Sequence, residues 1–184
     1  KTPWEGQAEA YSHLRLAIVA TSLDDLQRKL AWTRETLTAS GTKPLVNNLQ
    51  INDPRGIYFS EQPLGREGKV AFLFPGQGSQ YLNMLKDLAI QFPEVCACFE
   101  RADKTLQHQL SKPLSSYIFP PPTFSQEEES AQKQALTQTN VAQPAVGAAD
   151  MAMFHLLQEL GVHPNFVAGH SYGEYVALCA ASVF

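Results

Sequence analysis

The sequence predicts an α/β fold with a parallel sheet over residues 67–184, preceded by a small α+β unit over residues 1–66. Two apolar runs, KVAFLF (69–74) and PNFVAG (164–169), each lead into a glycine-containing turn and then a helical pattern. The segment QPLGREG (62–68) separates the two parts, because proline, glycine and charge together interrupt regular structure. We therefore expect a domain junction there.

The first unit begins with a β-branched apolar run, SHLRLAIVAT (12–21), which is expected to form a buried strand. A helix is expected next, since Ser22 and Asp25 form a capping-box-like start and Gly41 is a suitable C-terminal stop. Its leucines recur near helical spacing and give one buried face. After this helix we expect a loop, NNLQINDPRG (47–56), and a short strand, GIYFSE (56–61).

The second unit begins with the run that ends at Pro75-Gly76, whose apolar residues on both faces suit a central strand of a parallel sheet. The next segments are expected to be helical over 79–106 with a break near Pro93, and irregular over 111–124.

Two further helices are then expected. Ser125 and Glu128 form a capping-box pair at the start of a polar surface helix. A long helix follows over 142–161, with Pro144 in its first turn and Gly161 at its end. A strand at 164–169 and a helix from residue 171 complete the pattern.

Composition narrows the class of protein. The chain has 184 residues, 44% apolar and 17% charged, with a net charge of −4 and no basic face, so we expect no nucleic-acid partner. It has no run of the ~18 apolar residues that spans a bilayer and no signal peptide, so we expect no membrane partner and a cytoplasmic location. Cys96, Cys98 and Cys179 have no zinc-site spacing, and we expect no metal and buried, reduced thiols. Both ends lack natural boundaries, and we expect a piece of a longer protein.

The most informative motif is Gly169-x-Ser171-x-Gly173 between an expected strand and an expected helix. This is the nucleophile-elbow pattern, in which small flanking residues let a serine occupy a strained turn above the sheet. The helix N-terminus would favour a developing oxyanion there. The alternative is an ordinary serine in a turn, since the motif alone also occurs by chance.

A second turn, FPGQGSQ (74–80), also follows a strand and precedes a helix. Its spacing matches neither the P-loop nor the dinucleotide-binding pattern, which disfavours a nucleotide site. Both turns follow the C-terminal ends of strands, so they are expected at the same edge of the sheet, where α/β sites lie. Gly76 and Gly78 would let the backbone approach a ligand.

The stretches FPGQGSQ, TNVAQPA and GHSYGEYVAL, in this order and spacing, resemble the three motifs of malonyl-CoA:acyl-carrier-protein acyltransferases. The N-terminal part resembles the ketosynthase–acyltransferase linker of type I polyketide synthases. The insert at 117–132 and Tyr172 are similar to the iterative branches, namely enediyne, polyunsaturated fatty acid and glycolipid synthases. The fold implied is a linker subdomain followed by the N-terminal part of an α/β-hydrolase-like core.

The resemblance also implies roles for particular residues. Ser171 would be the acylated nucleophile, and the backbone N–H groups of Gln77 and Tyr172 would form the oxyanion hole. His170 and Gln143, with Gly76 and Gly78, would line the substrate site. The implied substrates are malonyl-CoA and a phosphopantetheinylated acyl carrier protein, with no cofactor, and an adjacent ketosynthase domain is the implied neighbour.

The resemblance places the family's catalytic histidine and carboxylate-binding arginine downstream of Ser171, past residue 184, so we expect this chain alone to be inactive. The histidines present are more typical of surface or packing positions: His13, His108, His155 and His163. Cys179 is expected to be buried and inert. Two alternatives stay open: a thioesterase or other serine hydrolase on the same elbow, and a non-catalytic scaffold with a vestigial serine turn.

Overall fold

The computed structural model describes residues 14–40, 49–62 and 68–184. The chain divides into two compact units, 1–68 and 69–184, and each is treated separately. The expected junction after residue 66, His13 and the helix stop at Gly41 lie outside the described residues. The assignment of the first unit as a linker stays a prediction. None of the helices in the described ranges is long and apolar enough to cross a membrane.

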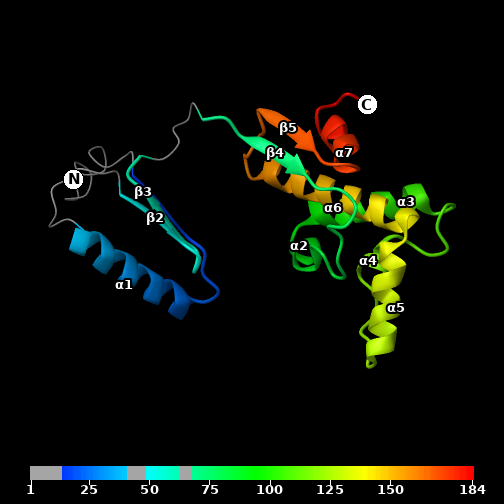
Figure 1. Ribbon diagram of the computed structural model, residues 1–184, viewed down its shortest axis with the longest axis horizontal. Helices are drawn as coiled ribbons and strands as arrows, with labels where there is room; N and C mark the ends of the chain where they lie inside the picture. Colours follow the sequence, from blue (N-terminus) through cyan, green and yellow to red (C-terminus); the bar gives the residue numbers. More distant parts are fainter. Residues whose placement is uncertain (1–13, 41–48, 63–67) are drawn as a thin grey trace. The chain divides into compact units, whose positions relative to one another are not determined.

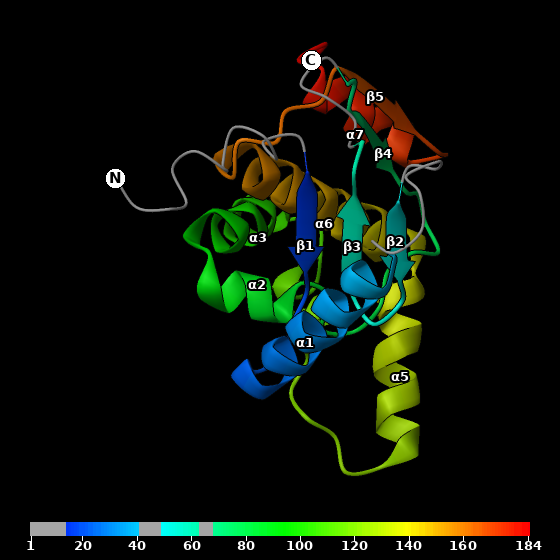
Figure 2. The same cartoon turned by 90° about the vertical axis from the view of Figure 1, so that its left-hand side faces the viewer.

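The first unit is a three-stranded antiparallel sheet with one helix across it (Figure 2). Its strands are β1 (Arg15–Ile18), β2 (Gln50–Asp53) and β3 (Ile57–Ser60), in the order β1-β3-β2, and its helix is α1 (Leu23–Ser40). Ile57 and Phe59 of the central strand are buried at 0% and 8% exposure, and Thr33 of α1 is buried at 2%. The helix begins as expected, since the Asp25 N–H donates to Ser22 Oγ at 3.1 Å.

Two expectations for this unit are wrong. The strand β1 is mostly exposed rather than buried, because it is an edge strand that pairs only with β3 among the described strands. The segment expected as a loop contains the strand β2, which is joined to β3 by a tight turn that Gly56 completes at a φ of 89°. The sequence of β2 is polar and shows no apolar strand pattern, because the strand is held by pairing with β3 rather than by burial.

The second unit has a parallel strand pair with helices packed on it (Figure 1). Its elements are β4 (Ala71–Phe74), α2 (Lys86–Gln91), α3 (Pro93–Leu106), α4 (Ser115–Ile118), α5 (Gln126–Thr137), α6 (Thr139–Glu159), β5 (Phe166–Gly169) and α7 (Gly173–Ala180). The parallel pairing of β4 with β5 and the helices around it confirm the expected mixed α/β fold. The main core lies where α3 packs against α6, around Val95, Leu114 and Ile118.

A smaller core holds the strand pair against α6 and α7. Phe74 of β4, Phe154 of α6 and Val176 of α7 are its buried centre. The Phe154 ring meets Phe72 edge-on at 6.0 Å and lies tilted against Phe74 at 6.2 Å. Because this cluster joins four elements, it fixes where the C-terminal ends of β4 and β5 stand relative to α6.

Three local details differ from expectation. Helix α6 begins at Thr139, so Pro144 lies inside the helix rather than in its first turn. The φ of proline suits a helix, but proline has no N–H to donate to the Asn140 carbonyl four residues earlier. Because Asn140 is exposed, water can bond that carbonyl instead. Residues 79–81 have no regular structure and residues 82–85 form turns, with Asn83 and Leu85 in the left-handed region. Helix α4 interrupts the segment expected to be irregular.

Strand β4 also shows less burial than a central strand. Leu73 is 77% exposed, and in the described part of the chain β4 pairs only with β5. The helix starts and stops agree better with expectation: the Glu128 N–H donates to Ser125 Oγ at 3.2 Å, and Gly161 follows α6 with a φ of 79°.

Candidate active site

Ser171 stands between the end of β5 and the start of α7 with a φ of 57°, in the left-handed region that side-chain-bearing residues rarely adopt. The two motif glycines explain how the chain reaches this turn. A Cβ on Gly169 would lie 2.1 Å from the carbonyl carbon and oxygen of Gly173, and a Cβ on Gly173 would lie 2.1 Å from the Phe74 carbonyl oxygen. No side chain fits at either position, so the strand, the turn and the helix meet backbone to backbone.

Backbone hydrogen bonds fix the turn on both sides. The His170 N–H donates to the Phe74 carbonyl at 3.0 Å, which continues the β4–β5 ladder to the residue before the serine. After the serine, the Gly173 N–H donates to His170 and the Glu174 N–H donates to Ser171, both at 3.0 Å. The strained serine is therefore held by the ladder before it and by the first turn of α7 after it.

The second turn packs directly against the first. A Cβ on Gly76 would lie 2.5 Å from the His170 carbonyl oxygen, 3.0 Å from Ser171 Cβ and 3.3 Å from the Tyr172 nitrogen. The expectation that both turns share one edge of the sheet agrees with this contact. Within the described ranges, the N–H groups of Gln77 and Tyr172 donate no intramolecular hydrogen bond. One of these N–H groups is on the residue after the serine and the other is on the residue after Gly76, and a pair of unpaired donors can stabilise an oxyanion.

A short chain of side-chain hydrogen bonds ties the second turn to α6. The Gln143 amide nitrogen donates to Gln77 Oε1 at 3.3 Å, and the Gln77 amide nitrogen donates to Thr139 Oγ1 at 3.3 Å. The sequence pointed to Gln77 and Gln143 but assigned no role to Thr139, although Thr139 is the first residue of the TNVAQPA motif. The three side chains hold the loop that carries the Gln77 N–H.

Gly78 differs from the other glycines of the site. Its φ is 110°, a Cβ there would meet nothing within 4 Å, and its N–H donates to Gln80 Oε1 at 2.7 Å. The glycine is therefore needed for the backbone turn rather than for a close approach. His170 is exposed and contributes backbone hydrogen bonds to the turn.

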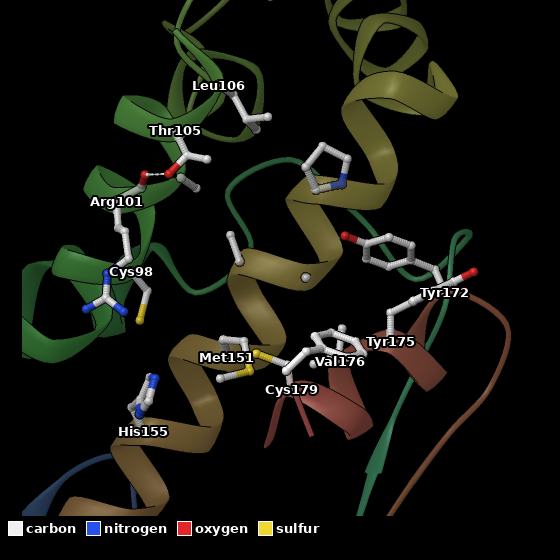
Figure 3. A pocket seen from close by; sticks show the side chains of 15 residues that line it. Cys98, Arg101, Thr105, Leu106, Met151, His155, Tyr172, Tyr175, Val176 and Cys179 are labelled. Carbon is white, nitrogen blue, oxygen red and sulfur yellow. Dashed lines mark hydrogen bonds between the residues drawn. The ribbon is translucent and has the colours of Figure 1, made fainter. Parts of the chain in front are cut away.

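The Tyr172 side chain reaches from the serine turn toward α6, as Figure 3 shows. It is one wall of an apolar cavity of about 430 Å³ between α3, α6 and α7. Met151, Val176 and Cys179 line the same cavity. The phenol is half-buried, and desolvation, followed by the charges of Asp150 and Cys179, raises its pKa.

Asp150 on α6 is a half-buried residue that the sequence did not single out. Its Oδ2 is enclosed and has no hydrogen-bond partner among the described residues. Desolvation raises its pKa from 3.8 to about 7, because no neighbouring donor offsets the loss of water. In the sequence, Asp150 is a single acidic residue in an apolar helix, and no motif around it indicates that its carboxyl is enclosed.

The remaining candidates fall outside the two turns. Cys179 is exposed rather than buried, because it occupies the last turn of α7 where the helix faces the cavity. Cys98 is buried, and burial raises the pKa of its thiol. His155 lines the cavity beside Phe154, and in the described chain no side chain hydrogen-bonds Ser171 Oγ. No cluster of three potential metal ligands occurs in the described ranges.

Comparison with known proteins agrees with this geometry. The pattern of the acyl transferase domain family matches residues 71–183. The chain is 43% identical over 113 residues to the malonyl CoA-acyl carrier protein transacylase of Bacillus subtilis (strain 168), a match that covers 61% of this chain and 31% of that protein. The chain thus spans about a third of that relative's length.

Solved structures give the same picture. The acyltransferase domain from the second module of the salinomycin polyketide synthase superposes with a TM-score of 0.62 at 32% identity, covering 94% of this chain and 34% of that one. A malonyl-transacylase solved in complex with its type II polyketide synthase acyl-carrier protein superposes with a TM-score of 0.51 at 41% identity, covering 62% and 33%.

Proposed function

This chain belongs to the acyl transferase domain family, and from that premise we propose that Ser171 carries a malonyl-type acyl group from a coenzyme A thioester to the thiol of an acyl carrier protein. The observation that carries the proposal is the left-handed Ser171 turn with the Gly76 loop packed against it. Backbone strain of this kind recurs at functional sites, but the exposed Ser182 has the same φ of 57°. What supports a role for Ser171 is the strain together with the glycine loop packed against it.

The reaction has two halves. In the first, Ser171 Oγ attacks the thioester carbonyl carbon, the C–S bond breaks, and coenzyme A leaves as the thiol with the serine proton. In the second, the phosphopantetheine thiol attacks the serine ester, the C–O bond breaks, and Ser171 regains a proton. Each half passes through a tetrahedral oxyanion, for which we propose the N–H groups of Gln77 and Tyr172 as the donors. Their support is that neither N–H has an intramolecular acceptor among the described residues.

A serine hydroxyl needs a proton acceptor, and a malonyl carboxylate favours a bidentate arginine. Ser171 Oγ has no such partner in the described part of the chain. We expect both groups to come from parts of the protein outside residues 1–184, so the chain alone would be inactive or severely impaired. The partners proposed are an acyl carrier protein and an adjacent ketosynthase domain, in a cytoplasmic polyketide or fatty-acid-like pathway.

The test is the intact mass of the protein after incubation with malonyl-CoA, beside Ser171→Ala. A malonyl adduct that the alanine variant lacks supports the proposal, and its transfer to a carrier thiol rather than to water separates acyltransferase from hydrolase. If residues 1–184 give no adduct, a longer polypeptide with the missing base and arginine is tested. Failure of that polypeptide too would leave a non-catalytic scaffold as the better explanation.

A further inference from the structure

Gly147 lies near the middle of α6, a helix that runs from Thr139 to Glu159. Glycine there is less favourable than alanine, because it loses more backbone freedom on folding and contributes no side-chain contacts. The position needs no unusual backbone, since Gly147 has none of the positive φ values that favour glycine. The reason for a glycine must therefore lie in what packs against the helix.

That neighbour is Tyr172. A Cβ added at Gly147 would lie 3.1 Å from Tyr172 Cε1 and 3.2 Å from its hydroxyl oxygen, which is tighter than ordinary van der Waals contact. All three of the nearest atoms to that Cβ belong to the Tyr172 phenol. The phenol of Tyr172 thus occupies the space that a side chain at position 147 would take. Figure 3 shows Tyr172 pointing toward α6.

The same side chain sits next to the serine. Tyr172 follows Ser171 directly, and among the described residues its N–H has no intramolecular acceptor. A ring fixed on α6 restrains the Tyr172 Cα, and through it the peptide between the two residues. The restraint comes from α6, an element that is itself held by both cores.

Asp150 stands one helical turn after Gly147, so the two residues share a face of α6. Desolvation, followed by the charge of Asp150, raises the pKa of Tyr172 and favours the protonated phenol. A neutral phenol suits a half-buried contact with a helix, whereas a phenolate would require desolvation of a charge.

We propose that Gly147 is a positioning residue that receives the Tyr172 phenol, and that the phenol so held aligns the Ser171–Tyr172 peptide for acyl transfer. The functional half of this inference rests on the proposed acyltransfer at Ser171. The packing half, that Gly147 receives the phenol, depends only on the contact between Gly147 and Tyr172. The two halves have separate readouts.

The packing half is tested by urea unfolding of four proteins: wild type, Gly147→Ala, Tyr172→Leu and the double variant. Alanine at 147 is expected to lower the midpoint when Tyr172 is present and to raise it in the Tyr172→Leu background, because only helix propensity then remains. A midpoint that rises equally in both backgrounds would overturn the packing.

The functional half is tested by steady-state transfer of the malonyl group from malonyl-CoA to an acyl carrier protein. The enzyme is a polypeptide that contains residues 1–184 and forms the malonyl adduct at Ser171. Gly147→Ala is expected to lower kcat about 10- to 100-fold with KM changed less than about twofold, since the oxyanion donors act in the transition state. The double variant should be no slower than Tyr172→Leu alone. Unchanged kcat in Gly147→Ala, or losses that multiply in the double variant, would overturn it.

The two proposals fail in different ways. If neither residues 1–184 nor the longer polypeptide takes up an acyl group, the proposed function fails and the alignment role fails with it. The four urea midpoints still decide whether Gly147 receives the ring. An active wild type with an equally active Gly147→Ala removes the alignment role alone.

Discussion

The His170 N–H donates to the Phe74 carbonyl at 3.0 Å, and this bond joins the last residue of β4 to the residue before the serine turn. The same Phe74 oxygen would lie 2.1 Å from a Cβ on Gly173. One carbonyl therefore both holds the turn and requires the second motif glycine. The turn depends on the strand beside it as much as on its own sequence.

Gly173→Ala is expected to destabilise the second unit by about 3 kcal/mol or more, because the clash is with backbone that cannot rotate away. Gly161→Ala is the control: its φ is 79° but a Cβ there meets nothing within 4 Å, so only about 1 kcal/mol is expected. Urea unfolding followed by circular dichroism measures both. Equal losses at the two glycines would contradict the close approach.

Asp150→Asn is expected to stabilise the protein increasingly as the pH rises. The folded-state pKa of Asp150 is about 7 against 3.8 when unfolded, so between these values the folded chain binds the extra proton and the unfolding free energy falls as pH increases. Allowing for partial solvent screening, the gain for asparagine at pH 8 is about 1–2 kcal/mol.

The measurement for Asp150 is the unfolding free energy of both proteins at pH 4 and pH 8. Glu159→Gln, at the exposed end of the same helix, is the matched control. A difference between Asp150→Asn and wild type that stays constant from pH 4 to pH 8 would show that the carboxyl is paired in solution.

Gln143→Ala is expected to slow acylation about tenfold through kcat, because the Gln77 loop loses one of its two side-chain tethers. Thr139→Val removes the other tether, and the two changes together should cost less than the product of their separate effects. Gln134→Ala, an exposed glutamine on α5, is the control. Full independence of the two substitutions would argue against a shared loop.

Lys29→Met is expected to raise the pKa of Asp25 from about 2 toward 3.8. The largest cause of the lowered value is the hydrogen bond from Lys29, whose Nζ lies 2.7 Å from Asp25 Oδ2, followed by the Thr21 N–H. Since the folded pKa is depressed, this pair stabilises α1 above pH 3.8 and the contribution is lost as pH falls toward 2.

Carboxyl titration by NMR measures the Asp25 pKa. Arg28→Met is the comparison, since Arg28 is 3.7 Å from Asp25 with a side chain that is 76% exposed, and it should change the pKa less. If Arg28→Met raised the pKa of Asp25 more than Lys29→Met does, Arg28 rather than Lys29 would be the main partner of Asp25.

Local sequence signals predicted those features whose cause is local. The helix starts at Ser22 and Ser125 and the stop at Gly161 agree with expectation because capping depends on residues within one turn. The strand β2 was missed and the start of α6 misplaced, because pairing with β3 and packing against α3 override weak propensities.

For the site, the sequence by itself predicted a sharp turn at Ser171, because a glycine stands two residues before and two residues after the serine, between an expected strand and an expected helix. The contact of that turn with Phe74 is tertiary. It also paired that turn with FPGQGSQ, because both follow parallel strands. Only the tertiary structure decided that Thr139 holds Gln77, that Gly147 makes room for Tyr172 and that Asp150 is enclosed without a partner. These depend on how α6 lies against the two turns, and that placement comes from the packing of Phe154 and its neighbours rather than from any local pattern.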